Sequence, residues 1–233
     1  MKGVEAFASA LGATFQALDW AALGASYCEG DATDFFGVER IEALRDAGLH
    51  FASDVGERLP AGGRSTYVGA GVAELAPILL EHVALGRDVR VHTRDEVECA
   101  LLDAALERAE QVCRFGLPRW TLAPIDEDRR HDHLWLVSVL TDPVAFPALH
   151  DTLYERGRPS RATVLRERGV AAELLDRAFA GLDVPGLVHT SGEELELVGE
   201  AAERRGLRLV VPDVGRLSPL VGDAVYACRC VGR

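Results

Sequence analysis

Lysine is almost absent from this sequence: Lys2 is the only one. The 25 lysine and arginine side chains are outnumbered by 37 acidic ones. The formal net charge is −12. A protein that grips nucleic acid phosphates needs a basic face, so this balance argues against a general nucleic-acid-binding protein. It leaves room for a local basic patch. We attribute the use of arginine in place of lysine to coding bias rather than to function.

Long apolar runs and a targeting segment are also missing. No stretch is long enough to span a bilayer, and the first residues do not combine a basic start with an apolar core. We therefore expect no membrane partner, no signal peptide and a cytoplasmic location.

Cysteine is scarce, scattered and odd in number, which argues against a disulfide framework and for a reducing compartment. The five are Cys28, Cys99, Cys113, Cys228 and Cys230. The last two would share one face of a strand, where we expect buried thiols. His131 and His133 have a spacing that could hold a metal, but no third ligand is indicated, so no metal site is expected.

The sequence is organised around the stretch from Ser65 to Pro77, which reads as a short buried strand, a Gly-x-Gly turn and a helix. Residues 1–60 before it read as helical, with a dense aromatic stretch from Trp20 to Phe36. We interpret these aromatic residues as the side chains through which helices pack onto a sheet. The alternative is a lid over a substrate pocket, lined by Trp20, Tyr27 or Phe35.

From Arg64 onward, strands and helices alternate. Ser191 is expected to cap a helix that Gly206 ends. Two final strands have no room for a helix between them and must therefore be antiparallel. The expected strands are Thr66–Gly69, Val89–Thr93, Trp120–Ile125, Leu134–Leu140, a short one at Ala162–Leu165, Leu207–Val211 and Ala224–Val231.

These patterns predict an α/β fold: a mostly parallel seven-stranded sheet with an antiparallel last strand, helices on both faces and a helical N-terminal extension. The expected division is residues 1–60 as the helical extension or lid, and residues 61–233 as the α/β domain.

Two segments carry a family resemblance: Tyr67–Ala76, and Thr190–Leu195 leading to Gly206–Val210. With the reversed last strand, residues 64–233 resemble the class I S-adenosylmethionine-dependent methyltransferases, which have a Rossmann-like fold. The resemblance implies S-adenosylmethionine as cofactor, bound at the carboxyl ends of the strands.

The resemblance also assigns cofactor contacts. The backbones of Gly69, Ala70 and Gly71 would face the methionine part. The family usually has an acid where Tyr67 stands, and its ribose-binding acid falls near Thr93. The remaining positions are Asp95, which a slipped alignment would bring to the ribose, Asp126 at the adenine amino group, and Ser138 at the end of the fourth strand.

The usual acids are therefore missing at Tyr67 and Thr93. Each lost hydrogen bond to a charged acceptor would cost on the order of 1.5–3 kcal/mol of cofactor binding. Methyl transfer needs alignment first and a base second. The candidate catalytic residues are His150 and Tyr154, near the expected pocket; the competing interpretation of His150 is a partly exposed helix residue.

Three functions remain. The preferred one is a methyltransferase with a small-molecule methyl acceptor and no nucleic acid substrate. The alternative is a protein of the same fold that has lost cofactor binding and serves as a binding or assembly partner. A nicotinamide-dependent oxidoreductase is the weakest, since Glu74 stands where its third spaced glycine or alanine belongs. The oligomeric state stays open, a homo-oligomer included.

Overall fold

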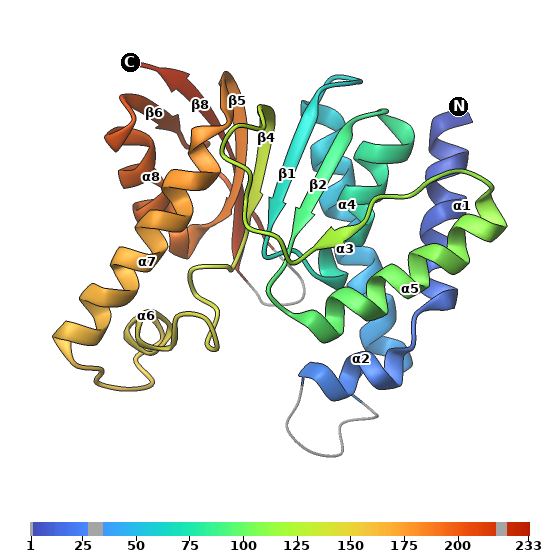
Figure 1. Ribbon diagram of the computed structural model, residues 1–233, viewed down its shortest axis with the longest axis horizontal. Helices are drawn as coiled ribbons and strands as arrows, with labels where there is room; N and C mark the ends of the chain where they lie inside the picture. The colour runs from blue at the N-terminus through green and yellow to red at the C-terminus, as the bar shows by residue number, and fades with distance from the viewer. Residues whose placement is uncertain (1, 28–34, 218–222) are drawn as a thin grey trace. The chain divides into compact units, whose positions relative to one another are not determined.

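The computed structural model describes residues 2–27, 35–217 and 223–233. Its strands form one sheet in the order β3-β2-β1-β4-β5-β8-β6 (Figure 1), and the two-residue β7 pairs with β8 outside this path. Cys28 and the other residues of the segment 28–34, within the aromatic stretch, lie outside the described residues. The strands are β1 (Arg64–Val68), β2 (Asp88–His92), β3 (Trp120–Thr121), β4 (His131–Leu136), β5 (Leu182–Ser191), β6 (Leu207–Val210), β7 (Arg216–Leu217) and β8 (Ala224–Gly232).

The reversed last strand is confirmed. β2 and β3 pair in parallel, as do β4 and β5, whereas β8 runs antiparallel to both β5 and β6. The α/β fold with a mostly parallel sheet is therefore as predicted, and β7 is an eighth strand that the sequence did not indicate. The chain divides into two compact units: unit 1 comprises residues 1–65 and 70–123, and unit 2 comprises residues 66–69 and 124–233.

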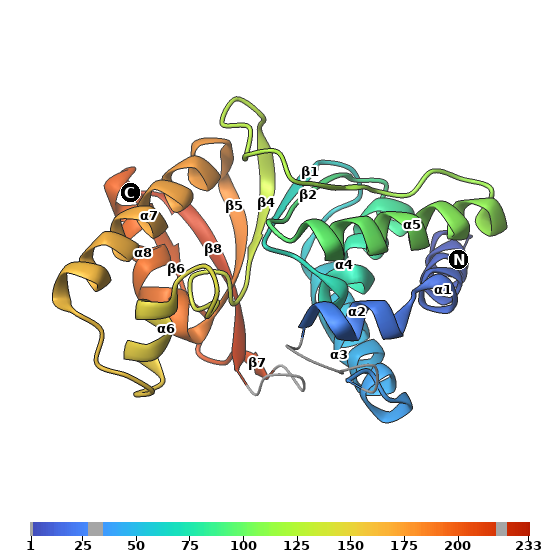
Figure 2. The same cartoon turned by 60° about the horizontal axis from the view of Figure 1, so that its bottom comes forward.

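Unit 1 contains the helical N-terminal segment, as predicted. A single long helix, α3, covers residues 38–58 of this segment. Within this unit α1 packs against α5, and α3 packs against α4 (Figure 2). The helices of unit 1 are α1 (Lys2–Ala17), α2 (Trp20–Tyr27), α3 (Val38–Arg58), α4 (Leu75–Leu79, continued by a π-helical turn at Leu80–Ala84) and α5 (Glu96–Cys113).

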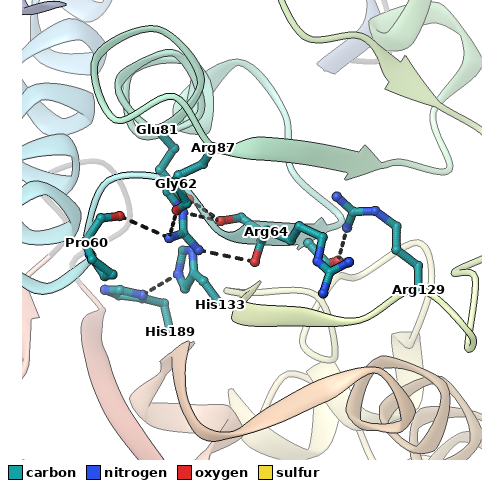
Figure 3. Close-up of polar contacts among 10 residues, drawn as sticks. Pro60, Gly62, Arg64, Glu81, Arg87, Arg129, His133 and His189 are labelled. Atoms are coloured by element: carbon teal, nitrogen blue, oxygen red, sulfur yellow. Dashed lines mark hydrogen bonds and ion pairs between the residues drawn. The ribbon is translucent and has the colours of Figure 1, made fainter.

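A buried ion pair organises the chain that enters β1 (Figure 3). Arg87 Nε lies 2.9 Å from Glu81 Oε2, and both side chains are fully buried. The Arg87 guanidinium also donates to the carbonyl oxygens of Pro60, Gly62 and Arg64. One buried cation thus satisfies three backbone acceptors, two in the glycine-rich segment before β1 and one at the first residue of β1.

Unit 2 has its own core beside three helices: α6 (Pro147–Leu153), α7 (Arg161–Ala180) and α8 (Leu195–Arg204). Cys228 and Cys230 are fully buried free thiols, as predicted. The core unites apolar residues of β4, β5 and β8 with residues of α7 and α8, among them Leu134, Leu136, Val188, Cys230, Leu175, Phe179 and Val198.

The strand expected at Ala162–Leu165 is wrong, since these residues form the first turn of α7. The Ser160 hydroxyl accepts a hydrogen bond from the Thr163 N–H at 3.1 Å and caps the helix. A β-branched pair inside this run favoured a strand, but the cap and the helical spacing of the buried residues further along α7 outweigh that preference.

Other boundaries also differ from prediction. β3 has only two residues, and β4 ends at Leu136, because Ser138 adopts φ +57° and cannot continue an extended strand. Ser191 does not cap α8; its hydroxyl donates to Glu194 Oε2 at 3.0 Å. Gly206 does follow the helix, at φ +69°. None of the described helices combines the length and apolarity needed to cross a bilayer.

Candidate functional site

The first glycine of the Gly-x-Gly turn is explained by packing inside unit 2. Gly69 has φ +67°, a left-handed conformation that favours glycine. A Cβ atom at this position would lie 2.7 Å from Val139 Cγ2. Val139 belongs to the segment that follows β4, so contact with this segment accounts for the glycine without a ligand.

The second half of the turn, in unit 1, has its backbone donors bound by carboxylates of the same chain. The Gly71 N–H donates to Glu74 Oε2 at 2.9 Å, and the Val72 N–H donates to Glu98 Oε1 at 2.8 Å. A Cβ atom at Gly71 would lie 2.5 Å from that same Glu98 oxygen. Two glutamates therefore hold the N–H groups beside the glycine that the resemblance assigns to the methionine part of a cofactor.

Glu98 is itself held from α2. The Tyr27 hydroxyl donates to Glu98 Oε1 at 2.6 Å. Burial raises the pKa of the Glu98 carboxyl, against the lowering effect of its hydrogen bonds from Tyr27 and Val72. Burial of the hydroxyl, together with the Glu98 charge, raises the pKa of Tyr27. The raised pKa of Tyr27 keeps the phenol protonated, so its hydroxyl is the donor to Glu98 Oε1.

The aromatic residues around Tyr27 form a packed cluster. The Tyr27 ring stacks on Phe35 with centroids 5.9 Å apart and meets Phe36 edge-on at 5.6 Å. Trp20 contacts Phe36 edge-on at 5.4 Å. Among the aromatic side chains named for a lid, Tyr27 is the one hydrogen-bonded to Glu98, whose carboxylate lies against the glycine turn.

The middle residue of the turn is buried and tied to β3. Ala70 is 2% exposed, and its carbonyl oxygen accepts a hydrogen bond from Trp120 Nε1 at 2.9 Å. Trp120 was expected only as a strand residue. Its indole fixes the backbone orientation of the turn from inside unit 1.

Asp95 and Thr93 lie together at the end of β2, where Asp95 caps α5. Asp95 Oδ1 accepts from the N–H groups of Val97 and Glu98, each at 2.9 Å. Thr93 is nearly buried, and its hydroxyl accepts from the Asp95 N–H at 3.3 Å. Asp95 Oδ1 therefore accepts hydrogen bonds from two free N–H groups at the start of α5, as an N-cap aspartate usually does.

Tyr67 lies in the core of unit 2. It is fully buried, and its ring stacks on Trp135 at 5.4 Å and meets His133 edge-on at 5.6 Å. His133 Nε2 is hydrogen-bonded to His189 Nδ1 at 2.9 Å, as Figure 3 shows. Where the family usually has an acid, this chain therefore has a ring in an aromatic and histidine cluster, an environment that would penalise a carboxylate.

Asp126 and Ser138, both in unit 2, make local contacts. Asp126 is exposed, and its Oδ1 accepts from the Asp128 N–H at 3.1 Å within a turn. The Ser138 N–H donates to Glu194 Oε2 at 2.9 Å, and the Leu140 N–H donates to Glu194 Oε1. Burial raises the pKa of Glu194, although these donors oppose the rise. Glu194 thereby holds Ser138 at its positive φ.

The two candidate catalytic residues do lie together, with the rings of His150 and Tyr154 4.7 Å apart. His150 Nδ1 donates to the Thr141 carbonyl oxygen at 2.8 Å, which leaves Nε2 as the acceptor nitrogen facing Arg156 at 3.4 Å. The Tyr154 hydroxyl donates to Glu193 Oε2 at 2.6 Å. Partial burial and the Glu193 carboxylate raise the pKa of Tyr154, which disfavours its use as a base.

Glu98 and Glu194 are the important residues that sequence reasoning missed. Glu98 had a signal, because Asp95-x-x-Glu98 matches the spacing of a capping box, in which the glutamate turns back to its own helix start. Here it turns to Val72 instead. Across the described parts of the chain, no group of three or more His, Cys, Asp or Glu side chains is placed to hold a metal ion.

Comparison with known proteins identifies the architecture. No protein-family model matches this sequence, and no curated protein matches it. Among solved structures, a methyltransferase from Pyrococcus furiosus matches with a TM-score of 0.50 and 15% identity, covering 80% of this chain and 83% of that one.

Two further structures are similar. NSun6 from Pyrococcus horikoshii with SFG matches with a TM-score of 0.50 and 10% identity, over 79% of this chain and 51% of that one. The precorrin-6y C5,15-methyltransferase from Geobacter metallireducens GS-15 has a TM-score of 0.47 and 14% identity, over 81% and 88%. The chain has the fold of the class I S-adenosylmethionine-dependent methyltransferases.

Proposed function

We propose that this chain uses the methyltransferase fold without taking up S-adenosylmethionine at the glycine turn, and that it works as a binding or assembly protein. The observation that carries this proposal is the pair of carboxylates on the turn. The N–H groups of Gly71 and Val72 are bound by Glu74 and Glu98. The residues present do not fit the methionine end of the cofactor.

Displacing Glu98 would be costly. A cofactor carboxylate would need these N–H groups as donors, and both are already bound by glutamates. A displaced Glu98 would leave the buried Val72 N–H without its acceptor, which costs roughly 1–3 kcal/mol, and the Tyr27 hydroxyl would need a new partner. Because Tyr67 and Thr93 stand where the family usually has acids, the expected affinity for S-adenosylmethionine is lowered further.

The second candidate is a methyltransferase acting on a small molecule. The fold and the Gly69-Ala70-Gly71 turn favour it, and His150 with Tyr154 supplies polar groups beyond the end of β4. On this reading Tyr27 and Glu98 must leave the turn before S-adenosylmethionine binds. The net charge of −12 favours a small acceptor over a nucleic acid.

Isothermal titration calorimetry separates the two. S-adenosylmethionine and its demethylated product are titrated into the folded wild type, with NAD(P) as a third ligand. We expect no heat from any of them. Saturable binding of the demethylated product by the wild type would overturn the proposal and support the methyltransferase, whereas heat with NAD(P) alone would support an oxidoreductase.

Variants locate the cause. Glu98→Ala clears the carboxylate from the turn, and Glu96→Ala is its matched control, because Glu96 is exposed in the same helical turn. Product binding gained by Glu98→Ala but not by Glu96→Ala would identify Glu98 as the obstacle. If neither variant binds the demethylated product, the absence of acids at Tyr67 and Thr93 is sufficient to explain the loss of cofactor binding.

A further inference from the structure

A cavity of about 810 Å³ lies in unit 2, beside the segment that joins α6 to α7. Three of its eight lining residues are the arginines Arg156, Arg158 and Arg161, and one is an acid, Glu155. In a chain with a net charge of −12, three cations around one hollow are a local reversal of the overall charge. A concave surface with converging guanidinium groups is suited to an anion.

These guanidinium groups have donors to spare. Within the described residues, neither Arg158 nor Arg161 makes an ion pair. Arg156 lies over the Tyr154 ring at 5.5 Å and reaches His150 Nε2 at 3.4 Å, contacts that leave most of its five N–H donors uncommitted. These exposed guanidinium groups are therefore accessible to a ligand.

The start of α7 adds to this local excess of positive charge. Arg161 is the first residue of this 20-residue helix, whose first turn contains no acid. The start of a helix carries partial positive charge, so a cation there is unfavourable and an anion favourable. Ser160 already caps one N–H. The Arg161 cation is therefore unfavourably placed in the free protein, and a bound anion would offset this cost.

We infer that this cavity binds the phosphate group of a small phosphorylated ligand. A compact dianion matches three guanidinium groups, whereas a long nucleic acid strand would extend from this hollow over a molecule with 37 acidic side chains. The inference deepens the proposed function, because it gives the binding protein a ligand class. Its residues are separate from the glycine turn, so S-adenosylmethionine binding would overturn the earlier proposal and leave this one standing.

Calorimetry with pyrophosphate in a phosphate-free buffer of low ionic strength tests the site in the full-length protein. We expect saturable binding, weakened about tenfold or more in Arg158→Ala/Arg161→Ala. Arg166→Ala is the matched control, since Arg166 is an exposed arginine of α7 outside the cavity lining, and it should bind like the wild type. No binding by the wild type, or equal binding by the double variant, would overturn the inference.

Two further readouts make the test specific. Without ligand, the double variant should unfold at the same temperature as the wild type or higher, because it loses unfavourable charge at the start of α7. A midpoint below that of Arg166→Ala would mean that the arginines hold the segment together, contrary to the inference. Short single-stranded oligonucleotides should not compete with pyrophosphate; affinity that grows with their length would point to a nucleic acid interface instead.

Discussion

The Tyr27 hydroxyl and the Val72 N–H converge on one oxygen of Glu98, at 2.6 and 2.8 Å. Through this oxygen, α2, the start of α5 and the glycine turn are joined within unit 1. We expect Tyr27→Phe to lower the free energy of unfolding by about 1.5 kcal/mol, the scale of a hydrogen bond to a charged group. Urea denaturation measures it.

Tyr154→Phe is the comparison, since its hydroxyl donates to Glu193 at the same 2.6 Å, but Glu193, unlike Glu98, is not buried. We expect a smaller loss there, because water replaces an exposed partner. Equal losses for both variants would mean that the Tyr27 bond has no special weight.

Gly71 is predicted to be required by Glu98 rather than by its backbone conformation. Its φ of −125° and ψ of −150° are open to any residue, but an added Cβ would meet Glu98 Oε1. Gly71→Ala should destabilise the wild type by about 1–2 kcal/mol through overpacking, and much less in a Glu98→Ala background. A double-mutant cycle by urea denaturation gives the coupling.

The control for this cycle is Gly12→Ala on α1, where an added Cβ meets nothing within 4 Å. That substitution should be neutral or stabilising in both backgrounds, because alanine favours the helix. If Gly71→Ala costs the same with and without Glu98, the packing explanation for this glycine is incorrect.

Arg87→Ala is expected to destabilise the protein by about 3–5 kcal/mol, because it strands Glu81 as a buried, uncompensated charge. It also removes the donors that hold the carbonyl oxygens of Pro60, Gly62 and Arg64. Arg90→Ala on β2, the strand that follows Arg87, is the control: the ion pair of Arg90 with Asp88 is exposed on both sides and should be worth less than about 1 kcal/mol. Comparable losses in denaturant unfolding would contradict the assigned role of Arg87.

Stability should fall as the pH drops below 6.5, in part through His131. Burial lowers the pKa of this histidine from 6.5 to about 4. The unfolded chain therefore takes up a proton at a higher pH than the folded one, and the stability present above pH 6.5 is lost as the pH falls toward 4. The shift corresponds to about 3 kcal/mol.

His131→Leu should flatten this part of the pH profile, whereas the exposed His50→Gln should leave it unchanged. Denaturant unfolding at a series of pH values between 4 and 6.5 measures both. Parallel profiles for the wild type and His131→Leu would show that His131 does not contribute to the acid sensitivity.

Part of the fold could be predicted because it depends on short-range patterns. The absence of room for a helix before Ala224 dictated the antiparallel last strand. β5 was not recognised, because Pro185-Gly186 inside it reads as a turn. The ladder accommodates this dipeptide by a register jump, from His131↔Leu182 to His133↔Leu187. Such an irregularity depends on the neighbouring strand and leaves no local signature.

The candidate site was predictable only in its backbone. Gly69 and Gly71 stood out in the sequence, but their occupants, Val139 and Glu98, are distant in the chain. The Asp95-x-x-Glu98 spacing indicated a capping box, yet tertiary packing with Tyr27 directs that carboxylate elsewhere. A glycine motif identifies where the backbone has room; the three-dimensional structure identifies what fills it.

The position of β8 between β5 and β6 has a consequence for biosynthesis. β6 obtains its partner only when the segment from Ala224 to Gly232 has emerged from the ribosome, because Leu207 pairs with Gly232. Until then β5 and β6 expose open edges, and nascent chains are vulnerable to mispairing there. Completion of unit 2 must therefore wait until translation has passed residue 232, whereas all residues of unit 1 have been synthesised by residue 123.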